Sequence, residues 1–89
     1  MAKSNINKGF QQITSLSSAT GLTVPAGSQL AFINCEGQAV RWRDDGTNPT
    51  TSIGHVLNVG ETLAYDGNLG LIKFIEVTTS AKLNVSYFE

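Results

Sequence analysis

Cysteine, histidine and tryptophan each occur once in this chain of 89 residues, and only two prolines are present. The single cysteine, Cys35, leaves no partner for a disulfide within the chain and no set of thiolates for a zinc site, which fits synthesis in a reducing compartment. A chain of this length forms one domain that buries only about 60 to 65% of its unfolded surface. We therefore expect a thin core that is reinforced by association with other protein chains.

Charged residues are also scarce, at 15% of the chain, where about 25% is usual in soluble domains. Six basic and seven acidic residues give a net charge of −1, so no basic field is available to attract phosphate groups. We therefore expect no nucleic acid as a partner. Uncharged polar side chains lose less solvation energy on burial than charged ones, which fits a surface that other protein covers.

Long apolar runs are missing as well. No stretch approaches the roughly 18 apolar residues that a membrane span requires, and the first ten residues, MAKSNINKGF, lack the apolar segment of a secretory signal. We expect a protein that is made in the cytosol, that stays there or leaves inside a larger assembly, and that has no membrane as a partner.

Short apolar segments separated by turn residues are what the sequence does contain. Turns are indicated at ATG, PAG, EG, DDG, NVG and DGNLG. The segments between them are rich in Val, Ile, Leu, Phe and Thr, which is typical of antiparallel all-β domains. We predict a small antiparallel β-sandwich of jelly-roll type, with seven to eight short strands over residues 10–89. The polar residues 1–9 are predicted to form a flexible N-terminal arm.

Alternation of side chains along the predicted strands indicates which residues face the core. The segment AVRWR places Val40 and Trp42 on the core side and both arginines outside. The segment QLAFINC is apolar on both sides, which predicts a central strand that is covered on both faces. The last two apolar segments, GLIKFIEV and AKLNVSYF, are predicted to form a hairpin that TTS joins.

Residues that could perform catalysis are few. Cys35 and His55 are the sole thiol and imidazole, they lie on different predicted elements, and no nucleophile-elbow motif is present. No glycine-rich loop leads into a helix to bind a nucleotide. We expect no catalytic residue and no cofactor.

Four carboxylates in turns, Asp44, Asp45, Glu61 and Asp66, could supply oxygen ligands to calcium. Their spacing matches no known calcium-binding loop. The motif DDG is better explained as a turn in which an aspartate bonds its own backbone and Gly46 adopts a positive φ. We therefore expect no metal site.

The arginines around Trp42 raise two further questions. An exposed tryptophan beside arginines and aspartates could stack on a sugar ring, but the alternation directs this indole into the core. For Arg41 and Arg43, two roles remain open. They could bind an adjacent subunit, or they could form surface ion pairs with Asp44 or Asp45.

Several motifs in residues 22–88 have a recognisable order: VPAG, AVRWRDDGTNPT, GETLAYDGNL, IKFIE and KLNVSYF. In this order the chain resembles a group of small virion-associated proteins that are encoded among the structural genes of tailed bacteriophages and prophages. The resemblance implies a non-enzymatic β-sandwich that is a structural part of the virion, without catalytic residues. The favoured position is that of a capsid decoration, or cement, protein that binds the capsid surface as a homo-oligomer, typically a trimer. A neck, tail or fibre component remains open, as does a module that binds host glycan around Trp42, Tyr65 and the DDG turn.

In this interpretation the partners are other copies of the chain and the major capsid protein or another virion protein. The N-terminal arm and the connection 47–55, which Pro49 predicts to be extended, are expected to make the contacts. Weak contacts made by several copies would add up through a high effective concentration. The predicted partner-binding residues are Lys3, Asn5, Ile6, Lys8, Phe10, Arg41, Arg43, Asn48, Pro49, Thr50 and Ile53.

Overall fold

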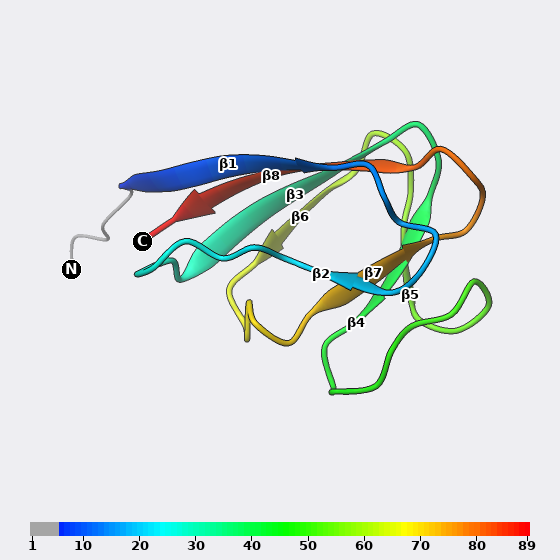
Figure 1. Cartoon of the computed structure of the whole chain (residues 1–89). Helices are drawn as coiled ribbons and strands as arrows, with labels where there is room; N and C mark the ends of the chain where they lie inside the picture. The colour runs from blue at the N-terminus through cyan, green and yellow to red at the C-terminus, as the bar shows by residue number, and fades with distance from the viewer. Residues whose placement is uncertain (1–5) are drawn as a thin grey trace.

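The computed structural model describes residues 6–89, which form two four-stranded antiparallel sheets packed face to face (Figure 1). Sheet A has the strand order β1 (Asn7–Ile13), β8 (Lys82–Phe88), β3 (Leu30–Glu36) and β6 (Thr62–Tyr65). Sheet B has the order β2 (Thr20–Gly21), β7 (Lys73–Glu76), β4 (Val40–Arg43) and β5 (His55–Leu57). Eight strands in this order make a jelly roll. The predicted small antiparallel β-sandwich is therefore confirmed.

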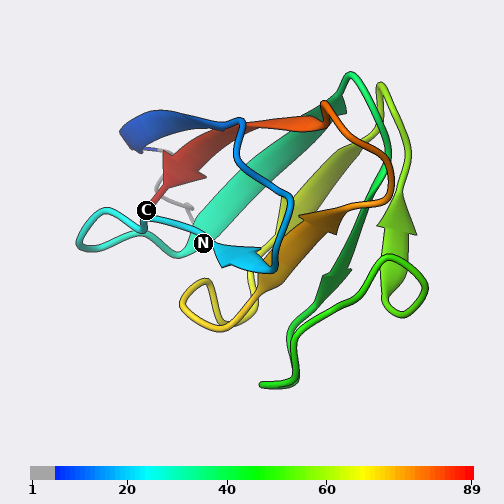
Figure 2. The ribbon, with the colours of Figure 1, turned by 45° about the vertical axis from the view of Figure 1, so that its right-hand side comes forward.

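Most strands pair with strands that are distant in the sequence. Only β4 and β5 are both consecutive and paired. The predicted hairpin between the last two strands is wrong, because β7 belongs to sheet B and β8 to sheet A. Residues 77–81 cross from sheet B to sheet A (Figure 2). The apolar face of β7 and the apolar face of β8 therefore both point into the core between the sheets.

The core lies between the two sheets and follows the predicted alternation. On β8, Leu83, Val85 and Tyr87 are buried, and on β7 so is Phe74. The buried Tyr87 hydroxyl donates a hydrogen bond of 2.7 Å to Gln11 Oε1 on β1, and burial raises the pKa of Tyr87 to about 12. The remaining buried apolar residues are Ile13, Leu16, Ala31, Ile33, Cys35, Val40, Leu57, Tyr65, Leu69, Ile72 and Ala81.

Strand β3 is central, as predicted, but its outer face is not covered. Ile33 and Cys35 are fully buried on the inner face, whereas Phe32 on the outer face is 39% exposed. Phe32 contacts Phe88 edge to face at a centroid distance of 5.4 Å. Phe10 and Phe32 both lie opposite Ser86 in the register, and Phe10 is 65% exposed. Phe10, Phe32 and Phe88 form what we call the outer aromatic patch of sheet A.

The sandwich begins earlier than the sequence predicted. Residues 7–9, which we expected in the arm, belong to β1 and pair with β8, with a bulge between Asn7 and Gly9. Strands pair through backbone hydrogen bonds, which do not require apolar side chains at every second position. A polar segment can therefore still form an edge strand. The boundary therefore moves from residue 10 to Asn7, and residues 1–5 of the predicted arm lie outside the described residues.

Residues 6–89 contain no helix, and therefore none of the length and hydrophobicity that would cross a membrane.

Candidate functional site

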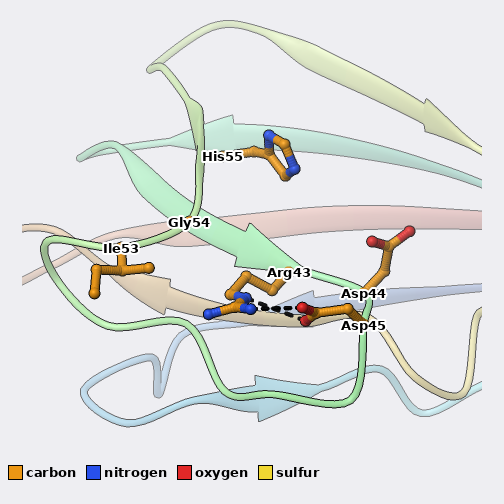
Figure 3. Close-up of a pocket in the computed structure, with 6 residues that line it drawn as sticks. All are labelled: Arg43, Asp44, Asp45, Ile53, Gly54 and His55. Carbon is orange, nitrogen blue, oxygen red and sulfur yellow. Dashed lines mark hydrogen bonds and ion pairs between the residues drawn. The ribbon is translucent and has the colours of Figure 1, made fainter.

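The motif RWRDDG lies where β4 ends and the connection to β5 begins, at the end of sheet B (Figures 1 and 3). Trp42 is paired in register with Phe74 on one side and His55 on the other. The indole is half-buried and packs against the core, as the alternation predicted. Its ring lies 4.6 Å from the His55 ring and 6.0 Å from the Tyr65 ring, centroid to centroid. The aromatic rings thus connect the two sheets at this end of the sandwich.

Asp44 is held in place from the opposite sheet. The Tyr65 hydroxyl donates a hydrogen bond of 2.8 Å to Asp44 Oδ2 and accepts one of 3.1 Å from the Asn68 backbone N–H. Burial raises the pKa of Tyr65, and its hydrogen bond to the Asp44 carboxylate raises this pKa further. The phenol therefore stays protonated and fixes the Asp44 carboxylate at the end of β4.

Asp45 is held by its own turn. The Arg43 guanidinium contacts both oxygens of Asp45, with an Nε–Oδ1 distance of 3.1 Å, and the Thr47 backbone N–H donates to Oδ1 at 3.3 Å. The hydrogen bond from Arg43 lowers the pKa of Asp45. Gly46 has a φ of 87°, so the predicted chemistry of the DDG turn is confirmed. Of the two roles open for Arg43, the ion pair within the chain is formed.

Within residues 6–89 Arg41 forms no ion pair with Asp44 or Asp45, and its contact with an adjacent subunit stays a prediction. Its Nε donates to the Thr51 carbonyl at 3.1 Å and its guanidinium also donates to the Gly54 carbonyl at 2.9 Å. Arg41 therefore anchors the β4–β5 connection to the outer side of sheet B. An arginine suits this task because its planar group presents several donors in a fixed arrangement.

The β4–β5 connection is folded rather than extended, in contrast to the prediction. Thr50 and Ile53 exchange backbone hydrogen bonds of 2.9 and 3.3 Å, which closes a tight turn at the tip. Pro49 is buried within the chain. Arg41 is bonded to backbone carbonyls of the connection and Pro49 is covered by the chain itself, and the partner contacts expected of both residues stay predictions.

A surface hollow of about 340 Å³ lies between the DDG turn and the start of β5 (Figure 3). Trp42 does not line it and sits behind His55. Sequence reasoning missed His55 and Gly54 as parts of this site. The one available signal was a lone histidine directly after a glycine at the end of a long connection. The hollow is lined by Arg43, Asp44, Asp45, Ile53, Gly54 and His55.

The remaining predicted partner-binding residues fall into two groups on different sheets. In the arm group, Lys3 and Asn5 lie outside the described residues, and Ile6, Lys8 and Phe10 lie at or within β1 of sheet A. In the loop group, Asn48, Thr50 and Ile53 are exposed on the connection that follows sheet B, and Ile53 is 57% exposed. The structure therefore does not bring the two groups together into one surface.

The two residues considered for catalysis have separate surroundings. The Cys35 thiol is buried and donates to the Gln38 carbonyl at 3.0 Å, and burial raises the pKa of this thiol. His55 is exposed and its ring packs at a tilt against Trp42. No Cys–His pair is formed between them.

The carboxylates considered for calcium are also dispersed. Asp44 and Asp45 have the partners described above, and Glu61 accepts the Asn58 backbone N–H at 2.8 Å. Within residues 6–89, no group of three or more histidine, cysteine, aspartate or glutamate side chains is placed to hold a metal ion.

Comparison with known proteins gives no match to a family model, to a curated protein or to a solved structure.

Proposed function

We propose that this protein is a non-enzymatic structural component of a bacteriophage virion, a decoration protein that binds the capsid surface as a homo-oligomer. The order of its motifs supports this proposal through the resemblance to small virion proteins. The jelly roll is compatible with it, because virus capsid proteins use this architecture. The observation that carries the proposal is the outer aromatic patch of sheet A, in which Phe10 is 65% and Phe32 39% exposed.

Two rows of uncharged side chains cross the outer face of sheet A, and the charged residues Glu36 and Lys82 lie opposite each other at its end. The first row consists of Phe10, Ser86, Phe32 and Ala64, and the second of Gln12, Asn84, Asn34 and Thr62. Complete burial of an exposed phenylalanine contributes about 1.5 to 3 kcal/mol. We assign this face to contact between copies of the chain, because a thin core gains most from such reinforcement.

We assign contact with the capsid to the tip of the β4–β5 connection. Asn48, Thr50 and Ile53 are exposed there, on a turn that Arg41 anchors to sheet B. A loop that is already ordered loses little conformational entropy when it binds. Each copy would contribute a weak contact, and the copies of one oligomer would bind together through high effective concentration.

The test is the copy number of the protein in assembled particles. Phage particles from a bacterium that carries the gene are purified on a density gradient, and the chain is quantified by mass spectrometry against the major capsid protein. A decoration protein is expected at a ratio within about threefold of the capsid protein. A few copies per particle would instead favour a neck, tail or fibre position. Absence from purified particles would refute the virion proposal.

A further inference from the structure

We propose that the hollow between the DDG turn and the start of β5 binds a neutral saccharide, and that His55 and Asp44 carry the recognition. This site differs from the one that the sequence suggested, because Trp42 supports the wall from behind and does not form it. The proposal does not depend on the virion assignment.

The hollow contains a hydrogen-bond acceptor and hydrogen-bond donors, and contacts within the chain hold them in place. Asp44 uses Oδ2 for the Tyr65 hydroxyl, which leaves Oδ1 to accept a hydrogen bond from a ligand. Arg43 uses Nε and one terminal nitrogen for Asp45, which leaves further N–H groups to donate. A sugar hydroxyl both donates and accepts, so a vicinal pair of hydroxyls matches an acceptor on Asp44 and a donor on Arg43.

The hollow also has an apolar side. Ile53 is 57% exposed at one edge, and His55 presents an exposed ring that packs at a tilt against Trp42. Figure 3 shows His55 above the Arg43–Asp45 pair and Ile53 to one side of it. A pyranose ring carries C–H groups on its faces and hydroxyls around its rim. Its face would pack on Ile53 and His55 while its rim reaches the polar groups.

The charges of the hollow disfavour an anionic ligand. Arg43 and Asp45 offset each other, and the remaining Asp44 carboxylate accepts a hydrogen bond from the uncharged Tyr65 hydroxyl. No excess positive charge remains in the hollow to select a phosphate or another anion. Because the walls are held by Arg41, Arg43 and Tyr65, a ligand would bind a preformed surface.

The experiment is a titration of the full chain, labelled with ¹⁵N, with glucose, galactose, mannose and N-acetylglucosamine up to about 50 mM. We expect saturable shifts of the amide signals of residues 43–47 and 53–55 with at least one sugar. The open shape of the site suggests a dissociation constant of about 1 mM or weaker. Emission of the single Trp42 gives a second measurement, because His55 contacts it.

Variants show whether the hollow is responsible. Asp44→Asn keeps an oxygen for Tyr65 but removes the carboxylate, and we expect it to weaken binding at least tenfold. Ile53→Ser changes an exposed side chain and should weaken binding without affecting the fold. Asp66→Asn, in the neighbouring β6–β7 connection and outside the hollow, is the matched control and should bind as the unchanged protein does.

Three outcomes would overturn the proposal. They are the absence of saturable shifts with all four sugars, shifts located on sheet A, and undiminished binding by Asp44→Asn. Saturable binding of inorganic phosphate or of lysine methyl ester at this site, without sugar binding, would refute the saccharide in favour of an ionic ligand. Failure of sugar binding would leave the particle measurement unaffected, because the outer aromatic patch lies on the other sheet.

Discussion

Gly37 and Gly46 have the same backbone conformation but different surroundings. Their φ angles are 85° and 87°, in the left-handed region that a side chain makes costly. A Cβ atom at Gly37 would lie 2.5 Å from the Ser80 carbonyl oxygen, whereas a Cβ at Gly46 would have no atom within 4 Å. The turn after β3 and the crossing segment before β8 therefore meet backbone to backbone.

We predict that Gly37→Ala destabilises the protein more than Gly46→Ala does. The backbone strain alone amounts to about 1 to 2 kcal/mol for either substitution, and the contact with Ser80 adds about 1 to 3 kcal/mol at Gly37. Urea unfolding followed by the fluorescence of Trp42 measures both variants. Equal losses of stability would mean that the contact with Ser80 is loose.

Single residues differ in how far the sequence could predict their roles. Period-two alternation placed Trp42 on the core side, and turn chemistry predicted the conformation of Gly46, because both depend only on neighbours in the chain. The role of Arg41 could not be predicted, since its acceptors are the backbone carbonyls of Thr51 and Gly54. A carbonyl group is present at every residue and leaves no mark in the sequence.

At the scale of elements, strand β1 includes residues 7–9 of the predicted N-terminal arm, which limits the deletions that can test the arm. Asn7 and Gly9 pair with Phe88 and Tyr87 at the end of β8, and the Ile6 carbonyl accepts a backbone hydrogen bond at the C-terminus. A deletion of residues 1–9 would therefore remove part of sheet A as well as the arm.

We predict that deletion of residues 1–9 lowers the free energy of unfolding by about 1 to 3 kcal/mol more than deletion of residues 1–5 does, because several backbone hydrogen bonds of about 0.5 to 1.5 kcal/mol each are lost with residues 7–9. Thermal unfolding measures the stability, and hydrogen exchange of the Phe88 amide reports fraying of β8. If both deletions behave alike, residues 7–9 do not contribute to the sheet.

The sequence predicted the places of most strands better than their pairing. The alternation in AKLNVSYF shows which side of the strand is buried, and Leu83, Val85 and Tyr87 are buried accordingly. It does not show which strand lies alongside, and so the hairpin between β7 and β8 was wrong. Hydrogen bonds between strands join backbone groups, which have no side-chain signature, so pairing must be determined from the structure.

At the scale of the whole molecule, the outer aromatic patch is the surface through which we expect the protein to associate. Phe10 is 65% exposed in the single chain, so its replacement costs the isolated domain little. Phe32 is 39% exposed and contacts Phe88, so its replacement costs the domain more. The uncharged rows of side chains beside these rings are also easily desolvated.

We predict that the purified protein sediments as an oligomer, a trimer in the decoration-protein interpretation, and that Phe10→Ser with Phe32→Ser converts it to a monomer. Val59→Ser with Val77→Ser is the control, because these valines are also exposed but lie in turns away from the patch. Analytical ultracentrifugation at several concentrations gives the masses. A double phenylalanine variant that still associates would assign oligomerisation to another surface.

The same patch explains one limit of sequence analysis. An apolar segment such as QLAFINC predicts that both faces of a strand are covered, but it cannot distinguish a layer of the same chain from a partner. In the described residues no second layer covers Phe32. The β-sandwich could be predicted because it depends on one buried face per strand, whereas the hollow could not, because it is formed by a loop that folds back.

The position of β8 also affects how the protein is synthesised. This strand lies between β1 and β3, so on the ribosome the first 80 residues cannot form a continuous sheet A. Contacts between residues so distant in sequence also slow folding. The outer surface of this sheet consequently takes shape only after translation has reached Phe88, when every other strand has already been made.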